Sequence, residues 1–202
     1  MRALPLSILV SCLLLLTAAS AYAQGSSVMW RFYYGQAFHS ELAATPSDPD
    51  GEEQTTQPNQ VGKGEVELIL WQRAGINLSR EVVLREFDAA PTVTATEEWL
   101  QYVGSLTLYA LPVEHNSFNL FAGFGNGYVE KYTLRLNGTT QTVPAAHKSI
   151  NLHRTFGGVE YTWERIGFRL EISRMTGEKT ADGIDAELDQ THQYLTLVIP
   201  LN

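Results

Sequence analysis

Apolar and polar residues alternate with a period of two in several segments of the chain. The clearest is 166–174, where one face carries Ile166, Phe168, Leu170 and Ile172 and the other carries Gly167, Arg169, Glu171 and Ser173. Such alternation is the pattern of a β-strand with one apolar face. The pattern recurs at residues 28–38, 64–71, about 79–87, 99–111, about 118–132, about 150–163 and 192–201. The chain is therefore predicted to be all-β with eight strands.

The connections between these segments alternate between short and long. Short turns are expected near residues 73–75, 113–116 and 163–165, and long connections at 39–63, 88–98, 133–149 and 175–191. An up-and-down membrane barrel with both termini in the periplasm has short periplasmic turns and long extracellular loops. A soluble sandwich or lipocalin gives no reason for this order. We therefore expect an eight-stranded antiparallel up-and-down transmembrane β-barrel.

The first 23 residues have the features of a secretory signal peptide. Arg2 supplies a positive charge, residues 4–16 are mostly apolar, and Ala21-Tyr22-Ala23 gives the small-x-small cleavage motif. We expect residues 1–23 to be removed and residues 24–202 to form one barrel domain in the outer membrane of a Gram-negative bacterium.

Composition narrows the chemistry that the chain can perform. Cys12 is the single cysteine and leaves with the leader, so we expect no disulfide and no thiol chemistry. A lipoprotein signal ending at Cys12 is the alternative, but the apolar stretch before it would be very short. The formal net charge of −8 becomes −9 once Arg2 is lost, which argues against nucleic acid as a partner. Beyond the leader, no apolar run approaches the length of a membrane-spanning helix.

Charged residues of both signs lie on the strand faces opposite the apolar stripe: Arg31, Glu65, Glu67, Glu81, Arg85, Glu160, Arg169 and Glu171. Inside a membrane barrel such charges must pair, because an unpaired buried charge is strongly destabilising. We expect a charge network in the lumen formed by Arg31, Glu67, Glu160, Arg169 and Glu171. The alternative is that these residues are the solvent-facing charges of a soluble barrel.

Two polar residues, Arg80 and Asn126, fall on the apolar faces instead. An arginine at mid-membrane costs about 2–4 kcal/mol, so we expect Arg80 at the periplasmic interface or a shorter third strand. Aromatic residues that fall near strand ends or on the apolar faces are typical of the girdles of membrane barrels: Trp30, Trp71, Trp99, Trp163, Tyr102, Tyr128 and Tyr161.

Two motifs resemble a known superfamily. Residues 121–128, Phe-Ala-Gly-Phe-Gly-Asn-Gly-Tyr, are similar to the glycine-punctuated strand of OmpA/OmpX-like small outer-membrane β-barrels. Residues 157–161 and 167–174 resemble the penultimate hairpin of that group. The resemblance implies the barrel fold, lipid and lipopolysaccharide as surroundings, and assembly by the barrel-assembly machinery. Members usually end in an aromatic residue that this machinery reads, whereas this chain has Pro200 in its last strand and ends in Leu201-Asn202.

Candidate chemistry is sparse. His115-Asn116-Ser117, with Glu114 beside it, resembles the His-x-Ser arrangement of lipid A deacylases. Phe118 departs from that family's pattern, and the triplet falls in a periplasmic turn, away from the outer leaflet. The acidic residues at 48, 50, 52 and 53 lack the spacing of an EF-hand loop, and His147 and His153 lack a third ligand. We therefore expect no cofactor and no metal.

The leading functional hypothesis is a non-enzymatic, monomeric barrel that contributes to the envelope, or binds an extracellular ligand, through long acidic loops. A narrow pore for small solutes, a lipid A-modifying enzyme and a soluble periplasmic binding barrel are the alternatives. The last strand is the weakest part of the fold prediction.

Overall fold

The computed structural model describes residues 28–44, 54–56, 60–90, 92–114, 116–142, 149–181 and 184–201. The expected leader lies outside these ranges, so its removal stays a prediction. No helix in the described ranges is long and apolar enough to cross a membrane.

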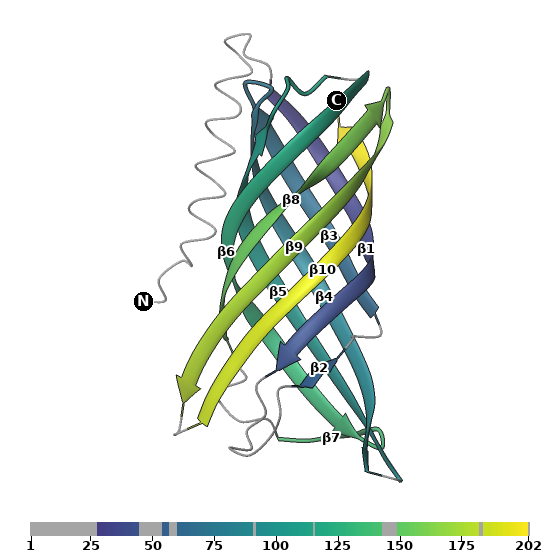
Figure 1. Cartoon of the computed structure of the whole chain (residues 1–202), viewed down its shortest axis with the longest axis vertical. Coiled ribbons are helices and arrows are strands. Elements are labelled where there is room, and N and C mark those ends of the chain that lie inside the picture. Colours follow the sequence, from purple (N-terminus) through teal and green to yellow (C-terminus); the bar gives the residue numbers. More distant parts are fainter. Residues whose placement is uncertain are drawn as a thin grey trace, which may run out of the picture.

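Eight long antiparallel strands close into a barrel (Figure 1). They are β1 (Val28–Ala44), β3 (Gln60–Leu70), β4 (Ala74–Ala90), β5 (Val93–Tyr109), β6 (Asn116–Leu136), β8 (Asn151–Trp163), β9 (Ile166–Ala181) and β10 (Ile184–Leu201). Consecutive long strands pair with each other, and β10 pairs with β1. Two short strands, β2 (Gln54–Thr56) and β7 (Thr139–Thr140), add to β1 and β6. The predicted eight-stranded up-and-down barrel is confirmed.

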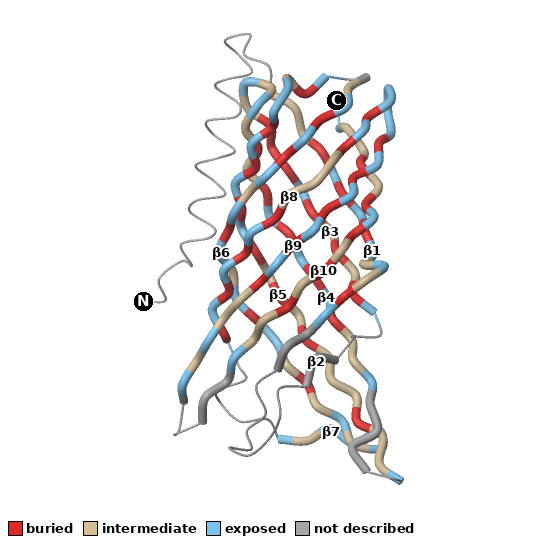
Figure 2. The backbone as a smooth tube through the Cα atoms, in the orientation of Figure 1, coloured by how far each residue is buried: buried red, intermediate tan, exposed pale blue. Residues whose placement is uncertain are grey.

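The barrel is apolar outside and polar inside. Burial alternates residue by residue along the strands (Figure 2), and the inward residues include many buried charges. On β9 the outward Phe168, Leu170 and Ile172 are 55, 48 and 59% exposed. Large apolar side chains are exposed in the same way on the other strands, among them Phe32, Leu78, Leu106, Leu120, Phe124 and Leu195. An apolar surface of this extent on a closed barrel is a lipid-facing surface, so the chain is a transmembrane barrel.

The last strand closes the barrel despite its proline. Trp30 pairs with Leu201, and the β1–β10 ladder continues to Ala43 and Asp189. On its other side, the ladder from β10 to β9 ends at the pair Val198–Gly167. Pro200 therefore lies beyond the last β9 partner, where its missing N–H breaks no bond to that strand.

Two of the long connections differ most from expectation. The segments 88–98 and 175–191 were expected to be long loops, but β4 and β5 pair up to Ala90–Val93, and β9 and β10 up to Ala181–Ile184. These segments are thus mostly strand, and form hairpins that extend from the barrel. The strands continue to pair beyond the lipid, where the outward residues are no longer apolar. A prediction based on apolar alternation therefore makes such strands too short.

The first short turn lies two residues earlier than expected, at Trp71-Gln72. Both residues have positive φ, 52° and 60°, and the N–H of Arg73 donates to the carbonyl oxygen of Leu70 at 3.2 Å. Two positive φ values in succession are the geometry of a type I′ hairpin turn. This turn fixes the register of β3 against β4, where Leu70 pairs with Ala74. It lies at the end with the other short turns and Leu201, which is the periplasmic end in barrels of this kind (Figure 1).

Arg80 lies higher on the barrel than expected. Its strand is longer than predicted, not shorter, and Arg80 is exposed on the outer face roughly eight residues beyond the periplasmic turn. With about 3.3 Å per residue and a tilt of about 40°, this is about 20 Å from the turn. Since the apolar belt of such barrels is about 25 Å tall, Arg80 lies toward its extracellular edge and not at the periplasmic interface.

Trp99 and Asn126 complete the comparison with the expected outer surface. Trp99 is not a girdle residue, because it points inward, is 2% exposed and stacks on Tyr132 with ring centroids 6.1 Å apart. Asn126 is on the outer face, as expected, and its side-chain oxygen lies 2.6 Å from Nδ1 of His153 on the neighbouring strand. Trp71, Trp163, Tyr128 and Tyr161 are exposed.

At inward glycines such as Gly158 the neighbouring strand lies too close to leave room for a side chain, which gives the first prediction. A Cβ on Gly158 of β8 would lie 1.9 Å from the carbonyl oxygen of Leu170, whereas one on Gly62 of β3 would have no atom within 4 Å. We expect Gly158→Val to destabilise the barrel by about 1–3 kcal/mol through overpacking, and Gly62→Val to be tolerated. Urea titration in lipid vesicles, read from the heat-modifiable gel migration of the folded form, measures both. Equal stability of the two variants would contradict the strand spacing.

Candidate functional site in the barrel interior

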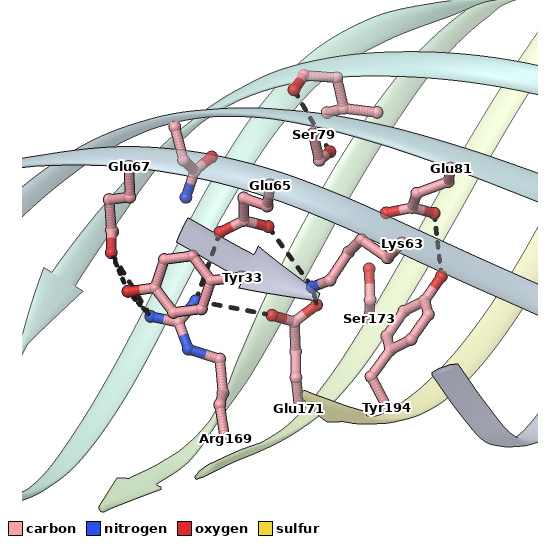
Figure 3. Close-up of polar contacts among 12 residues, drawn as sticks. Tyr33, Lys63, Glu65, Glu67, Ser79, Glu81, Arg169, Glu171, Ser173 and Tyr194 are labelled. Atoms are coloured by element: carbon pink, nitrogen blue, oxygen red, sulfur yellow. Dashed lines mark hydrogen bonds and ion pairs between the residues drawn. The ribbon is translucent and has the colours of Figure 1, made fainter. Parts of the chain in front are cut away.

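The middle of the lumen holds a buried network of charged residues from five strands (Figure 3). Its cations are Arg31, Lys63, Arg154 and Arg169, and its carboxylates are Glu65, Glu67, Glu81, Glu160 and Glu171. All nine residues are at most 2% exposed. They meet because inward positions recur at every second residue on each strand, and the strand registers bring these positions to similar depth.

Arg169 of β9 is the hub of the periplasmic half of this network. Its Nη2 lies 2.8 Å from Oε2 of Glu160 and its Nη1 lies 3.4 Å from Oε1 of Glu65. The Cζ of Arg169 also lies over two aromatic rings, 4.1 Å from the centroid of Tyr33 and 4.2 Å from that of Phe121. Ion pairs and cation–π contacts together compensate the charge of Arg169, which lipid could not solvate.

Two further groups of the periplasmic half depend on this hub. Arg31 is ion-paired with the other carboxylate oxygen of Glu160, so Glu160 is shared by two arginines. Glu67 accepts hydrogen bonds from the hydroxyls of Tyr33 and Tyr109, the second at 2.6 Å. Its distance to Arg169 Nη2 is 3.5 Å, so neutral hydroxyl donors provide its shortest contacts.

Glu171 has the corresponding role in the extracellular half. Lys63 Nζ lies 2.8 Å from Oε1 of Glu171 and 3.4 Å from Oε2 of Glu65. Arg154 Nη2 contacts the same Glu171 oxygen, and the Arg154 guanidinium also donates to the hydroxyls of Ser173 and Ser79, at 3.0 and 3.2 Å. Two cations and one carboxylate therefore form the centre of this half.

A chain of neutral donors continues from the network toward the extracellular end. Glu81 accepts from Tyr194 at 2.9 Å and from Gln101 at 3.0 Å. Gln190 donates to Gln101 at 2.9 Å, and Nε2 of His192 lies 2.8 Å from Oε1 of Gln190. These contacts compensate Glu81, whose nearest cation, Arg154, is 3.9 Å away.

Five carboxylates face four cations in this network, so its formal charge is −1. The carboxylates with the longest cation contacts, Glu67 and Glu81, are also those that accept hydrogen bonds from tyrosine hydroxyls. Hydrogen bonds to a charged acceptor are worth more than neutral ones, so the tyrosines offset the missing cation. The chain itself thus supplies most partners of the network, while one side-chain atom each of Arg31, Glu65, Glu67, Glu81 and Glu171 has no hydrogen-bond partner among the described residues.

Apolar clusters lie on both sides of the charged layer. Toward the periplasm, one consists of Ile69, Tyr109, Val113, Phe121 and Phe156, with Met29 against it. Toward the extracellular end, the other consists of Val61, Val83, Trp99, Val129, Ile150, Leu152 and Tyr194. Side chains therefore fill the lumen along much of its length, as in other narrow eight-stranded barrels.

All five residues expected in the lumen network lie there. Arg31, Glu160 and Arg169 are in direct contact, Glu67 contacts Arg169, and Glu171 lies 3.9 Å from Arg169 through its second oxygen. Of the other charges expected to face inward, Glu65 and Glu81 belong to the network. Arg85 lies apart from it and pairs with Glu97 at 3.2 Å.

Sequence reasoning missed two cations, Lys63 and Arg154. Lys63 fell at the end of a presumed loop, because β3 begins earlier than its apolar pattern. Arg154 is an even number of residues from Glu160 on the same strand, so the alternation predicts that both face inward. The pattern was interpreted only around Val159, and Arg154 was therefore missed. Tyr33 was hidden among aromatic neighbours of the opposite face.

The other candidate chemistry gains no catalytic geometry in the described part of the chain. The hydroxyl of Ser117 donates to the carbonyl oxygen of Glu114 at 3.0 Å and accepts from the Glu114 N–H at 3.3 Å, which closes a polar turn. His115 lies outside the described residues, as do the acidic positions 48, 50, 52 and 53. The described residues contain no group of three His, Cys, Asp or Glu placed to hold a metal ion.

Comparisons with known proteins agree with this architecture. No protein-family model matches the sequence, and no curated protein matches it. Among solved structures, Neisserial surface protein A matches with a TM-score of 0.60 at 7% identity, over 87% of this chain and 98% of that one. Ail of Yersinia pestis, in complex with the heparin analogue sucrose octasulfate, matches with a TM-score of 0.52 at 11% identity, over 87 and 99% of the two chains. The outer membrane protein AlkL matches at 0.52 and 11%, over 86 and 90%.

These matches, at such low identity, are matches of fold. Together with the apolar exterior, they show that the chain has the eight-stranded β-barrel fold of small outer-membrane proteins. The resemblance to OmpA/OmpX-like barrels is thereby confirmed for the architecture.

Glu160 provides the test of the charge network. Glu160→Leu leaves Arg31 and Arg169 without their shared carboxylate, and we expect a loss of about 3–5 kcal/mol in the free energy of unfolding. Glu130→Gln, on the exposed outer face of β6, is the control and should change stability little. The double variant Arg31→Leu/Glu160→Leu should recover part of the loss, because one uncompensated charge is removed with its partner. Urea titration in vesicles measures all three, and a double variant no more stable than Glu160→Leu would contradict the pairing.

Proposed function

We propose that this protein is a closed, non-enzymatic outer-membrane barrel that acts as a rigid scaffold for its extracellular hairpins, with an envelope-structural or surface-interaction role. The observation that carries the proposal is the layered lumen. Between two apolar clusters, the lumen is occupied by ion-paired and hydrogen-bonded charged side chains that are each at most 2% exposed. A narrow pore would need a water-filled path instead.

The hairpins supply the other half of the proposal. β4 and β5 continue as a paired ribbon to Ala90 and Val93, and β9 and β10 continue to Ala181 and Ile184. A paired ribbon presents its side chains with less conformational freedom than a loop, which favours binding. The described extracellular part of these hairpins is rich in carboxylates, including Glu86, Glu97, Glu98, Glu178 and Glu187.

The sign of this charge guides the choice of partner. The Ail structure holds a sulfated sugar, which is strongly anionic, whereas the hairpins of this chain carry an excess of negative charge. Charge complementarity therefore supports a basic surface or peptide as the extracellular partner, not a sulfated sugar. The lumen network adds stiffness beneath the hairpins and takes no part in this contact.

Planar-bilayer recording tests the closed lumen. We expect a flat current trace for the purified, folded protein at all voltages, because ions would have to displace buried ion pairs and cross two apolar layers. Flotation with the vesicles and heat-modifiable migration show that the protein in the experiment is inserted and folded. Reproducible single-channel steps would replace the scaffold proposal by the narrow pore.

Shortening one hairpin tests its role. Gly177 and Leu188 are cross-strand partners on β9 and β10, so residues 178–187 can be replaced by Asn-Gly without a change of register. We expect unchanged heat-modifiable migration, because the last pairs of β9 with β8 and of β10 with β1 lie below the replaced residues. We also expect at least a severalfold loss of binding of cells to an immobilised polycation, because the change removes the four acidic residues Glu178, Asp182, Asp185 and Glu187 and only one basic residue, Lys179. Full binding by the shortened chain would show that this hairpin is not the contact.

Mass spectrometry of lipid A incubated with wild type and Ser117→Ala tests the enzymatic alternative, and we expect no modification by either.

A further inference from the structure

Arg80 is an exposed cation within the apolar outer face of the barrel. Its outward neighbours on β4 are Leu78 and Val82, which are 56 and 36% exposed. Among the described residues, Arg80 has no ion-pair or hydrogen-bond partner, in contrast to the arginines of the lumen. A guanidinium on a lipid-facing surface needs a partner, because the surrounding acyl chains provide none.

The strands beside Arg80 leave space around its side chain. Its cross-strand partner on β3 is Gly64, and the next outward residue of β3 is Gly62. A Cβ on either glycine would have no atom within 4 Å, so the space over both glycines is open. On the other side, Arg80 pairs with Tyr102 of β5, whose ring lies 6.0 Å from that of Tyr128. Aromatic rings of this kind are typical of the headgroup level of a membrane.

Residues at a similar height on other strands mark the same level. Roughly eight residues from the periplasmic strand ends, as for Arg80, the outward residues are Gln36 on β1, Thr155 on β8, Arg174 on β9 and Gln193 on β10. On these four strands the outer face thus changes from apolar to polar near the height of Arg80, whereas β6 carries the exposed Phe124 at the same distance from its periplasmic end. The long side chain of Arg80 can reach this boundary from within the apolar belt.

Arg174 shows why Arg80 is distinct. Arg174 is also an outward cation at this height, but its guanidinium makes two hydrogen bonds to the carboxylate of Asp189, at 3.1 and 2.7 Å. No acidic residue lies beside Arg80 in the pairing register, where its partners are Gly64 and Tyr102. The protein therefore neutralises one cation at this level and leaves the other available.

We propose that Arg80, next to the open surface over Gly62 and Gly64 and beside Tyr102, binds the phosphate group of a phosphorylated glycolipid of the outer leaflet. The guanidinium provides paired donors suited to phosphate oxygens. The apolar residues below it, including Leu78, contact the acyl chains of the same lipid. The site requires only that the barrel spans the membrane, and it is independent of whether the lumen conducts.

Thermal stabilisation by lipid tests this site. The folded protein in neutral detergent micelles is titrated with bisphosphorylated lipid A, with its dephosphorylated form and with inorganic phosphate, and the melting midpoint is read from heat-modifiable migration. A ligand that binds only the folded state raises this midpoint in proportion to its affinity. We expect the bisphosphorylated lipid to raise it, and the dephosphorylated lipid and inorganic phosphate to have little effect.

Three variants locate the effect. Arg80→Gln should weaken the apparent affinity for the bisphosphorylated lipid roughly tenfold or more, since a charge-assisted hydrogen bond is lost. Arg80→Lys should retain part of the affinity as a point charge. Gly64→Leu fills the open space over Gly64 while the charge of Arg80 stays, and should weaken binding without a loss of stability in lipid-free micelles.

Arg174→Gln is the matched control, because it removes a cation of similar height that is already paired. Its affinity should equal that of wild type. Equal affinity of wild type and Arg80→Gln, equal stabilisation by the dephosphorylated lipid, or equal stabilisation by inorganic phosphate would each overturn the proposal.

Discussion

The hydrocarbon core of a membrane offers no hydrogen-bond partners, and every level of this structure depends on that constraint. The backbone meets it by closing β10 on β1, so that no strand edge is left within the barrel wall. The charged side chains meet it by pairing within the lumen, where Arg169 alone contacts several carboxylates and two aromatic rings. Alternation along each strand links the two solutions, because it places an apolar residue outside wherever a polar one is placed inside.

A buried ion-pair network is not the most stable filling that a lumen can have, since desolvation of its charges offsets much of their attraction. Its advantage is that it defines one arrangement of the strands. If β8 slipped by one residue against β9, Glu160 would leave Arg169 and point into lipid. The network therefore penalises wrong registers more strongly than an apolar core would. The apolar clusters on either side strengthen this effect, because they lower the polarity around the ion pairs.

The sequence predicts the parts of this structure that follow from the alternation of inward and outward positions along each strand. The eight strands, the inside-out distribution and the facing of Arg31, Glu160 and Arg169 all depend only on whether a residue number is odd or even within a strand. Depth along the barrel axis is different, because it depends on where each strand begins. Lys63 was missed and Arg80 was misplaced for this reason, since β3 and β4 extend beyond their apolar patterns. Contacts such as Glu171 with Lys63, 108 positions apart, require the register of strands that the pattern does not specify.

Arginines inside and outside the barrel show the same constraint resolved by different partners. Arg31 is fully buried, and the chain itself supplies its carboxylate from Glu160. Arg80 faces outward, and the neighbouring strands place a glycine and a tyrosine beside it but no carboxylate. A carboxylate placed beside it on the outer face would have to be desolvated with it, whereas an ionised lipid headgroup is already at the membrane surface. An arginine on the outer face can therefore be neutralised by the surrounding lipid, whereas an arginine in the lumen must be neutralised by other residues of the chain.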